Sequence, residues 1–172
     1  MKKNISVFIL LILLASSFKY RSKAREASIV SVPNAAEKAA WAEKAAFDSL
    51  MVHLDEANRQ LAAGNTMPLK KLWSGREDVT FLCAGARKDA KGWKAVETSL
   101  QQFAKDLPQH NQFTSETIAT YKGKDQACIL QKERYLPANG KGVTIQATTL
   151  VRKEMNAWKI VHKQADILPS GK

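Results

Sequence analysis

The residues best suited to chemistry lie near the end of the chain, in a run that alternates like a β-strand. From Trp158 to Asp166 every second residue falls on one face, which continues through Ile160 and ends in His162, Gln164 and Asp166. An aspartate held near apolar walls can act as a general acid or base, and a histidine can carry the proton. This pattern predicts a pocket wall with Asp166 as base or ligand acceptor and His162 as proton carrier or donor.

The spacing shows that these two groups do not form a direct pair. Four residues along a strand span about 13 Å, so each needs a partner from a neighbouring strand or helix. A three-residue loop 155–157 with Asn156 left-handed predicts the register of the last two strands. The expected pairs are Glu154 with Trp158, Leu150 with His162, Thr148 with Gln164 and Gln146 with Asp166. Gln146, Thr148 and Gln164 would then orient a ligand.

The structural alternative is that His162 and Asp166 only satisfy backbone groups near the chain end. A buried Asp166 in a closed pocket would favour chemistry.

On the preceding strand, Glu133 and Tyr135 share a face. They bind ligand if that face looks inward, and Glu133 belongs to a solvated edge if it does not. The expected pocket walls are Trp73, Phe81 and Trp93, which are also typical core residues.

Apolar periodicity predicts the elements that hold these groups. Three helices are expected at 34–64, 67–73 and 92–105, the first capped by Asn34 and Glu37. A strand at 78–83 separates the second and third. Four strands follow as an antiparallel meander at 113–121, 126–136, 143–152 and 158–167. The order predicts an α+β, cone-shaped fold, in which a curved, mostly antiparallel sheet wraps around three N-terminal helices.

This chain resembles the nuclear transport factor 2-like superfamily, and within it the SnoaL-like and ketosteroid-isomerase-like branch, from about Ala35 to Asp166. The matching segments are Ala63-Gly64-Asn65, Leu72-Trp73-Ser74, Asp78-Val79-Thr80, Gly92-Trp93, Thr148, Arg152-Lys153 and Trp158 to His162 with Asp166. The resemblance implies the cone fold, a pocket between sheet and helices, and homodimers formed through the sheet. Many relatives have a second histidine where this chain has Gln164, and an arginine where it has Gln146, which weakens an ionic or two-histidine site.

Two functions follow from this resemblance. The first is binding of a small, partly apolar organic ligand in the cone, with cofactor-free acid–base catalysis of isomerase, hydrolase or cyclase type left open. The second is a non-catalytic dimerisation or assembly module that uses the outer sheet face. Whether the protein is an enzyme is left open.

Bulk properties limit the compartment and the partners. The 172 residues carry a net charge of +11 and suffice for one domain. A basic start, Lys2-Lys3, precedes an apolar run, 5–18, that is shorter than the ~20 residues of a membrane span. This indicates a signal peptide and export to the periplasm or medium, with no stable membrane insertion after cleavage following Ser17 or Ala24. The expected division is 1–24 signal and start of linker, 25–33 linker, 34–168 domain and 169–172 tail.

The remaining motifs argue against other classes of function. The basic residues are scattered and no nucleic-acid-reading motif occurs, so nucleic acid is not an expected partner. His53, His110 and His162 lack ligand spacing, so no metal is expected, and no phosphate loop or dinucleotide motif suggests a cofactor. Cys83 and Cys128 lie in strand-like runs, and their pairing is left open.

Overall fold

The structure is a computed structural model, and it describes residues 33–83, 89–107, 111–137 and 141–169. The expected signal peptide and almost all of the expected linker lie outside these residues. The chain divides into two compact units, Met1–Ala40 and Trp41–Lys172. In the first unit, helix α2 (Ala35–Ala62) begins with the predicted capping box. The N–H of Glu37 donates to Asn34 Oδ1 at 2.9 Å, and the N–H of Asn34 donates to Glu37 Oε2 at 2.8 Å.

The second unit contains the rest of α2, two further helices and one sheet. The helices are α3 (Met67–Leu72) and α4 (Trp93–Asp106); the strands are β1 (Thr80–Cys83), β2 (Ala90–Lys91), β3 (Asn111–Lys122), β4 (Gln126–Pro137), β5 (Val143–Glu154) and β6 (Ala157–Leu168). The strand order is β2-β1-β6-β5-β4-β3, antiparallel except for the β1–β6 pair. The α+β fold and the meander are confirmed, whereas β2 is not among the predicted strands. Of the helices described, none is long and apolar enough to cross a bilayer.

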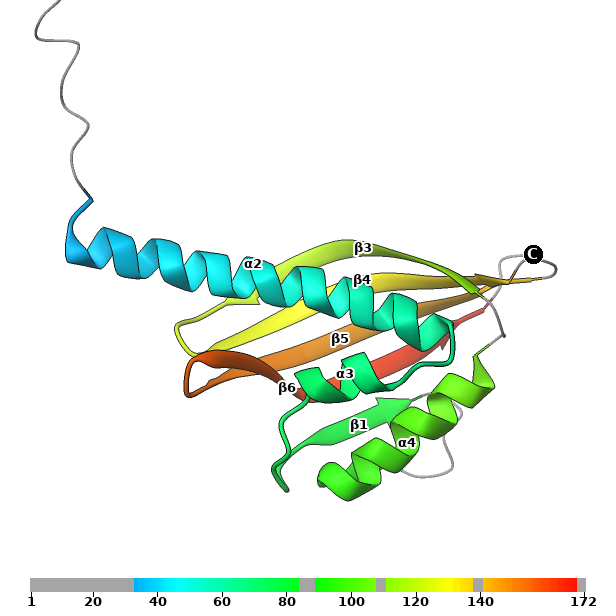
Figure 1. Ribbon diagram of the computed structural model, residues 1–172. Helices are drawn as coiled ribbons and strands as arrows, with labels where there is room; N and C mark the ends of the chain where they lie inside the picture. The colour runs from blue at the N-terminus through cyan, green and yellow to red at the C-terminus, as the bar shows by residue number, and fades with distance from the viewer. Residues whose placement is uncertain (1–32, 84–88, 108–110, 138–140, 170–172) are drawn as a thin grey trace, which may run out of the picture. The chain divides into compact units, whose positions relative to one another are not determined.

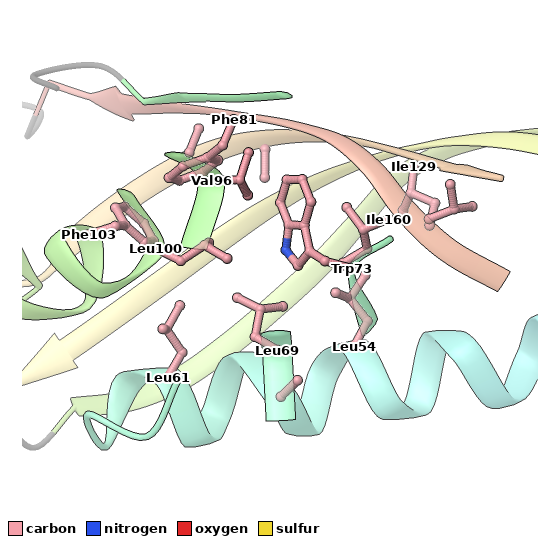
Figure 2. Close-up of a cluster of buried hydrophobic side chains, with 14 of the residues drawn as sticks. Leu54, Leu61, Leu69, Trp73, Phe81, Val96, Leu100, Phe103, Ile129 and Ile160 are labelled. Carbon is pink, nitrogen blue, oxygen red and sulfur yellow. The ribbon is translucent and has the colours of Figure 1, made fainter. Parts of the chain in front are cut away.

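Helices cover one face of the sheet, which we call the inner face (Figure 1). On β4, every second residue from Ala127 to Tyr135 is buried on this face, and the residues between them are partly or fully exposed on the outer face. The buried apolar cluster between α2, α3, α4 and the inner face includes Leu54, Leu69 and Leu100 (Figure 2). Burying such side chains stabilises each by about 1.5–3 kcal/mol relative to exposure.

A β-bulge at Val161 changes which residues of β6 face inward. His162 pairs with Leu150, and the next pair along is Ile160 with Val151, so Val161 has no partner on β5. An extra residue shifts the alternation by one position. Trp158 and Ile160 are buried before the bulge, whereas Lys163 and Ala165 are buried after it. The prediction that one face runs unbroken from Trp158 to Asp166 is therefore wrong beyond Ile160.

The β5–β6 turn differs from the prediction in a compensating way. Glu154 pairs with Ala157, and Trp158 pairs with Lys153, so the connection has two residues instead of three. The residue with left-handed backbone is Met155, with φ of 54°, and not Asn156. The turn shifts the register by one residue and the bulge shifts it back. The pairs predicted beyond the bulge, including Gln146 with Asp166, are therefore confirmed.

The two cysteines lie on different strands. Cys83 is on β1 and Cys128 is on β4, and β6 and β5 separate these strands. Three strand spacings are about 14 Å, whereas a disulfide needs Cα atoms within about 7 Å. The fold therefore keeps the two cysteines from pairing with each other.

Candidate functional site

The four polar residues predicted to lie beside His162 do lie together, but on the outer face of the sheet. With His162 they form what we call the outer polar row: Gln146, Thr148, Gln164 and Asp166. Gln164 Nε2 donates to Asp166 Oδ2 at 2.8 Å, and the register places Thr148 beside Gln164 and Gln146 beside Asp166. Gln146 and Asp166 are exposed, and Thr148 and Gln164 are partly exposed. The buried Asp166 that would favour chemistry there is not found. The catalytic roles assigned to His162 and Asp166 stay predictions, now for an outer surface instead of a pocket wall.

His162 contacts the neighbouring strand β1. Its Nδ1 lies 2.7 Å from Oγ1 of Thr80, its pairing partner on that strand. Partial burial lowers the pKa of the imidazole from its ordinary value of 6.5. This contact joins the short parallel strand to the meander, which is a structural use of the histidine.

The lowered pKa of His162 predicts a pH dependence of stability. The unfolded chain takes up the imidazole proton at a higher pH than the folded chain does, so the folded state loses stability as pH falls through about 6.5. We expect the melting temperature to fall more between about pH 7.5 and about pH 5.5 in the wild type than in His162→Gln. Carboxylates titrate mostly below this window and affect both proteins alike. Equal falls in the two melting temperatures would contradict the assignment.

The expected walls lie in or beside the core. Trp73 and Phe81 are buried, with ring centroids 6.2 Å apart at an interplanar angle of 83°, and Phe103 packs edge-on against Phe81 at 5.7 Å. Figure 2 shows these three rings between the helices and the sheet. Trp93 begins α4 and is partly buried against the same core. Edge-to-face ring pairs add about 0.5–1.5 kcal/mol beyond area burial.

The face of β4 that carries Glu133 and Tyr135 looks inward, which the sequence alone did not decide. Glu133 and Tyr135 are both 0 % exposed, and Tyr135 Oη donates a 3.0 Å hydrogen bond to Glu133 Oε2. Burial, and then the adjacent Glu133 carboxylate, raise the pKa of the Tyr135 phenol well above its ordinary value, so Tyr135 keeps its proton as a donor. Glu133 therefore lies in the interior and not on a solvated edge.

Lys163 completes this site, and the sequence reasoning missed it. Its Nζ donates to Glu133 Oε1 at 2.7 Å, and the Lys163 side chain is 1 % exposed. Asn58 Nδ2, from α2, donates to the same oxygen at 3.3 Å. We call Asn58, Gln131, Glu133, Tyr135, Thr149 and Lys163 the inner polar cluster. Strict alternation placed Lys163 on the face of β6 that points away from Ile160. Only the bulge at Val161 turns the Lys163 side chain inward.

The strand register explains how Lys163 reaches a carboxylate two strands away. Glu133 lies opposite Ile145 of β5, and Lys163 lies opposite Thr149 of β5. Ala147 is the inward residue between those two, and it is fully buried. The two residues are separated by two strand spacings, about 10 Å, and by four residues along the strands, about 13 Å, so the diagonal between them passes over Ala147. A methyl side chain at that position leaves room for the lysine stem.

Several buried polar atoms near the cluster have no hydrogen-bond partner among the described residues. They are Asn58 Oδ1, Gln131 Oε1, Thr149 Oγ1 and, on the apolar side, Trp73 Nε1. Their residues are at most 4 % exposed. About nine in ten buried polar groups in folded proteins are hydrogen-bonded, so a group of unpaired ones indicates a place for water or ligand.

The described surface also holds clefts away from the cluster. One, of about 480 Å³, is lined by Glu77, Asp89 and the start of α4; another, of about 490 Å³, is lined by Glu56, Arg59 and Gln112 with their neighbours. No residue of the inner polar cluster lines either cleft. The inner polar cluster is therefore separate from both surface clefts.

Fold and site together define an NTF2-like cone domain, in which helices cover the inner face of a curved sheet. The SnoaL-like domain profile matches residues 50–168, and the chain belongs to that family. A search of curated proteins found no sequence that matches.

Solved structures share the fold at low sequence identity. A candidate calcium/calmodulin-dependent protein kinase type II association domain from Thiobacillus denitrificans has a TM-score of 0.60 and 14 % identity, over 71 % of this chain and 94 % of that one. A candidate dehydratase of the NTF2-like family from Streptomyces avermitilis has a TM-score of 0.59 and 17 % identity, over 74 % and 97 %. An NTF2-like protein of unknown function from Shewanella oneidensis has a TM-score of 0.56 and 16 % identity, over 72 % and 98 %.

Proposed function

We propose that this domain binds a small, partly apolar organic molecule between the inner sheet face and the helices, at the inner polar cluster. The observation that carries the proposal is the set of unpaired atoms Asn58 Oδ1, Gln131 Oε1 and Thr149 Oγ1 beside the buried Glu133–Lys163 pair. Ligand sites commonly combine apolar walls with a few placed polar groups. Trp73 and Phe81 supply such a wall here, and Trp73 Nε1 is a further unpaired donor.

The hydrogen bonds of Glu133 favour binding over catalysis. A general base needs a carboxylate free to take a proton from the substrate. The Glu133 carboxylate already accepts hydrogen bonds from Lys163, Asn58 and Tyr135. Both carboxylate oxygens are therefore already engaged within the protein. Isomerase, hydrolase or cyclase chemistry therefore stays a secondary part of this proposal.

Mass spectrometry of small molecules released from the purified, denatured protein tests the proposal. We expect the wild type to release an organic molecule, and Gln131→Leu to release about ten-fold less, since one hydrogen bond contributes about 1 kcal/mol and the unpaired ligand group adds to the loss. Gln146→Leu is the matched control, because it removes the same amide from the outer face. Failure of the wild type to release any molecule, or equal release by the two variants, would count against the site.

Two further variants separate the inner cluster from the outer polar row. Asp166→Asn and His162→Ala change the groups first assigned to catalysis, and both lie on the outer face. We expect each to retain the bound molecule at the wild-type level. If either one loses it while Gln131→Leu retains it, the outer row is the site.

A second candidate function is self-assembly through the outer face, and we propose a homodimer on this surface. The face carries Tyr121, 67 % exposed, beside the partly exposed Leu130 and Leu150. Apolar groups of this kind in a contiguous patch often mark interfaces. We expect light scattering to give a dimer mass for the wild type and a monomer mass for Leu130→Lys, because the lysine would place a charge in the interface. A monomeric wild type would contradict the proposal.

We also propose that the chain is exported. The support is the basic start followed by the apolar run 5–18, which together are typical of a signal peptide. Intact mass of the protein recovered outside the cytoplasm should show cleavage after Ser17 or Ala24. An uncleaved mass there would contradict the assignment.

A further inference from the structure

The charge balance of the interior limits the ligand that the inner polar cluster can take. Among the described residues, Glu133 and Lys163 are the charged side chains that are fully buried, and each is the other's partner at 2.7 Å. The net buried charge is therefore zero. Removing an ion from water costs several kcal/mol unless a counter-charge and hydrogen bonds compensate it. An anionic or cationic ligand would find no such counter-charge and would have to disrupt the existing pair.

The unpaired atoms near the pair offer both an acceptor and a donor. Gln131 Oε1 is an amide oxygen and can only accept, whereas Gln131 Nε2 donates to Thr117 Oγ1 at 3.3 Å. Thr149 Oγ1 has a hydroxyl hydrogen to donate, and Thr149 lies directly opposite Lys163. A ligand hydroxyl can donate to the first and accept from the second. A carboxylate or an ether could accept from Thr149 Oγ1 but has no hydrogen to donate to Gln131 Oε1.

Resting on the proposed function, we propose that the ligand is an uncharged organic alcohol or phenol. Its hydroxyl donates to Gln131 Oε1 and accepts from Thr149 Oγ1. Its apolar part lies toward Trp73 and Phe81. The Glu133–Lys163 pair remains intact beside it and contributes no net charge to recognition.

Four probes of similar size test the charge and the hydroxyl separately. They are benzyl alcohol, benzoate, benzylamine and toluene, each titrated into the full chain and followed by ligand-observed NMR. We expect benzyl alcohol to bind at least about ten-fold more tightly than the other three, because each of them leaves either a charge or a polar atom unpaired. Small fragments bind weakly, so the comparison rests on ratios of dissociation constants.

Variants with matched controls locate the binding. Thr149→Val keeps the shape and removes the hydroxyl, and it should weaken benzyl alcohol binding about ten-fold with no loss of folding. Thr148→Val makes the same change one residue away on the outer face and should leave binding unchanged. Gln131→Leu should weaken the binding of benzyl alcohol and leave the binding of toluene unchanged. Equal losses from Thr148→Val and Thr149→Val would overturn the placement.

The outcomes distinguish this inference from the function beneath it. Benzoate or benzylamine binding as tightly as benzyl alcohol would overturn the uncharged ligand while leaving ligand binding intact. Toluene binding as tightly as the alcohol would overturn the role of the hydroxyl. If none of the four probes binds although the purified wild type releases an organic molecule, the alcohol or phenol is overturned and the ligand-binding function stands.

Discussion

Replacing Lys163 with methionine is expected to lower the free energy of unfolding by about 3–5 kcal/mol, which is a large share of a domain's stability. Methionine preserves most of the volume of the lysine stem but removes the ammonium group. The Glu133 carboxylate is fully buried and would lose its 2.7 Å ion pair. An uncompensated buried charge is among the most costly changes that a core can receive.

Urea unfolding measures this loss, and two further variants define its cause. Lys132→Met changes a partly exposed lysine on the outer face of β4, and a loss within about 0.5 kcal/mol is expected. The double variant Lys163→Met/Glu133→Leu removes both charges and should recover most of the stability. Recovery stays incomplete because Tyr135 Oη and Asn58 Nδ2 lose their acceptor. A loss below about 1 kcal/mol in the single variant would show that Glu133 is not held as a buried carboxylate.

The second large effect is expected from Ala147→Leu, with a loss of about 3 kcal/mol or more in the free energy of unfolding. Overpacking a core alone costs about 1–3 kcal/mol. At this position the added side chain also occupies the path between Lys163 and Glu133, so the ion pair would have to lengthen or break. The matched control is Ala157→Leu, at the exposed first position of β6.

A double-mutant cycle isolates the coupling between Ala147 and the ion pair. In the Lys163→Met/Glu133→Leu background, Ala147→Leu should cost only the overpacking part, because no pair remains to be broken. Residues in contact typically show interaction energies of about 0.5–3 kcal/mol. Additive losses would mean that the pair does not cross Ala147.

Most of the architecture could be predicted from the sequence because its signals are local. The Asn34–Glu37 box marks the start of α2, and the alternation on β3 to β6 marks four long strands. Each signal lies within a few residues of the structure that it specifies. The two-residue β2 carries too short a pattern to be recognised, and its pairing with β1 is set by tertiary contacts.

The inner polar cluster could be predicted only in part, because it depends on which face each strand turns inward. Alternation grouped Glu133 with Tyr135 correctly but could not say which side they face. The bulge at Val161 leaves no local sequence signal, because a bulge residue can have an ordinary side chain. Lys163 also violates the expectation that lysine is exposed, and only its pairing with Glu133 makes its burial acceptable.

Because of the bulge at Val161, the positions of β6 that are most sensitive to substitution alternate differently before and after that residue. Before it, the positions that tolerate change least should be the even-numbered ones, Trp158 and Ile160; after it they should be the odd-numbered ones, Lys163 and Ala165. A gapless comparison with a relative lacking the extra residue would match outer positions of one chain with inner positions of the other. Site residues carried over by such a comparison would then fall on the wrong side of the sheet, even where every strand is correctly identified.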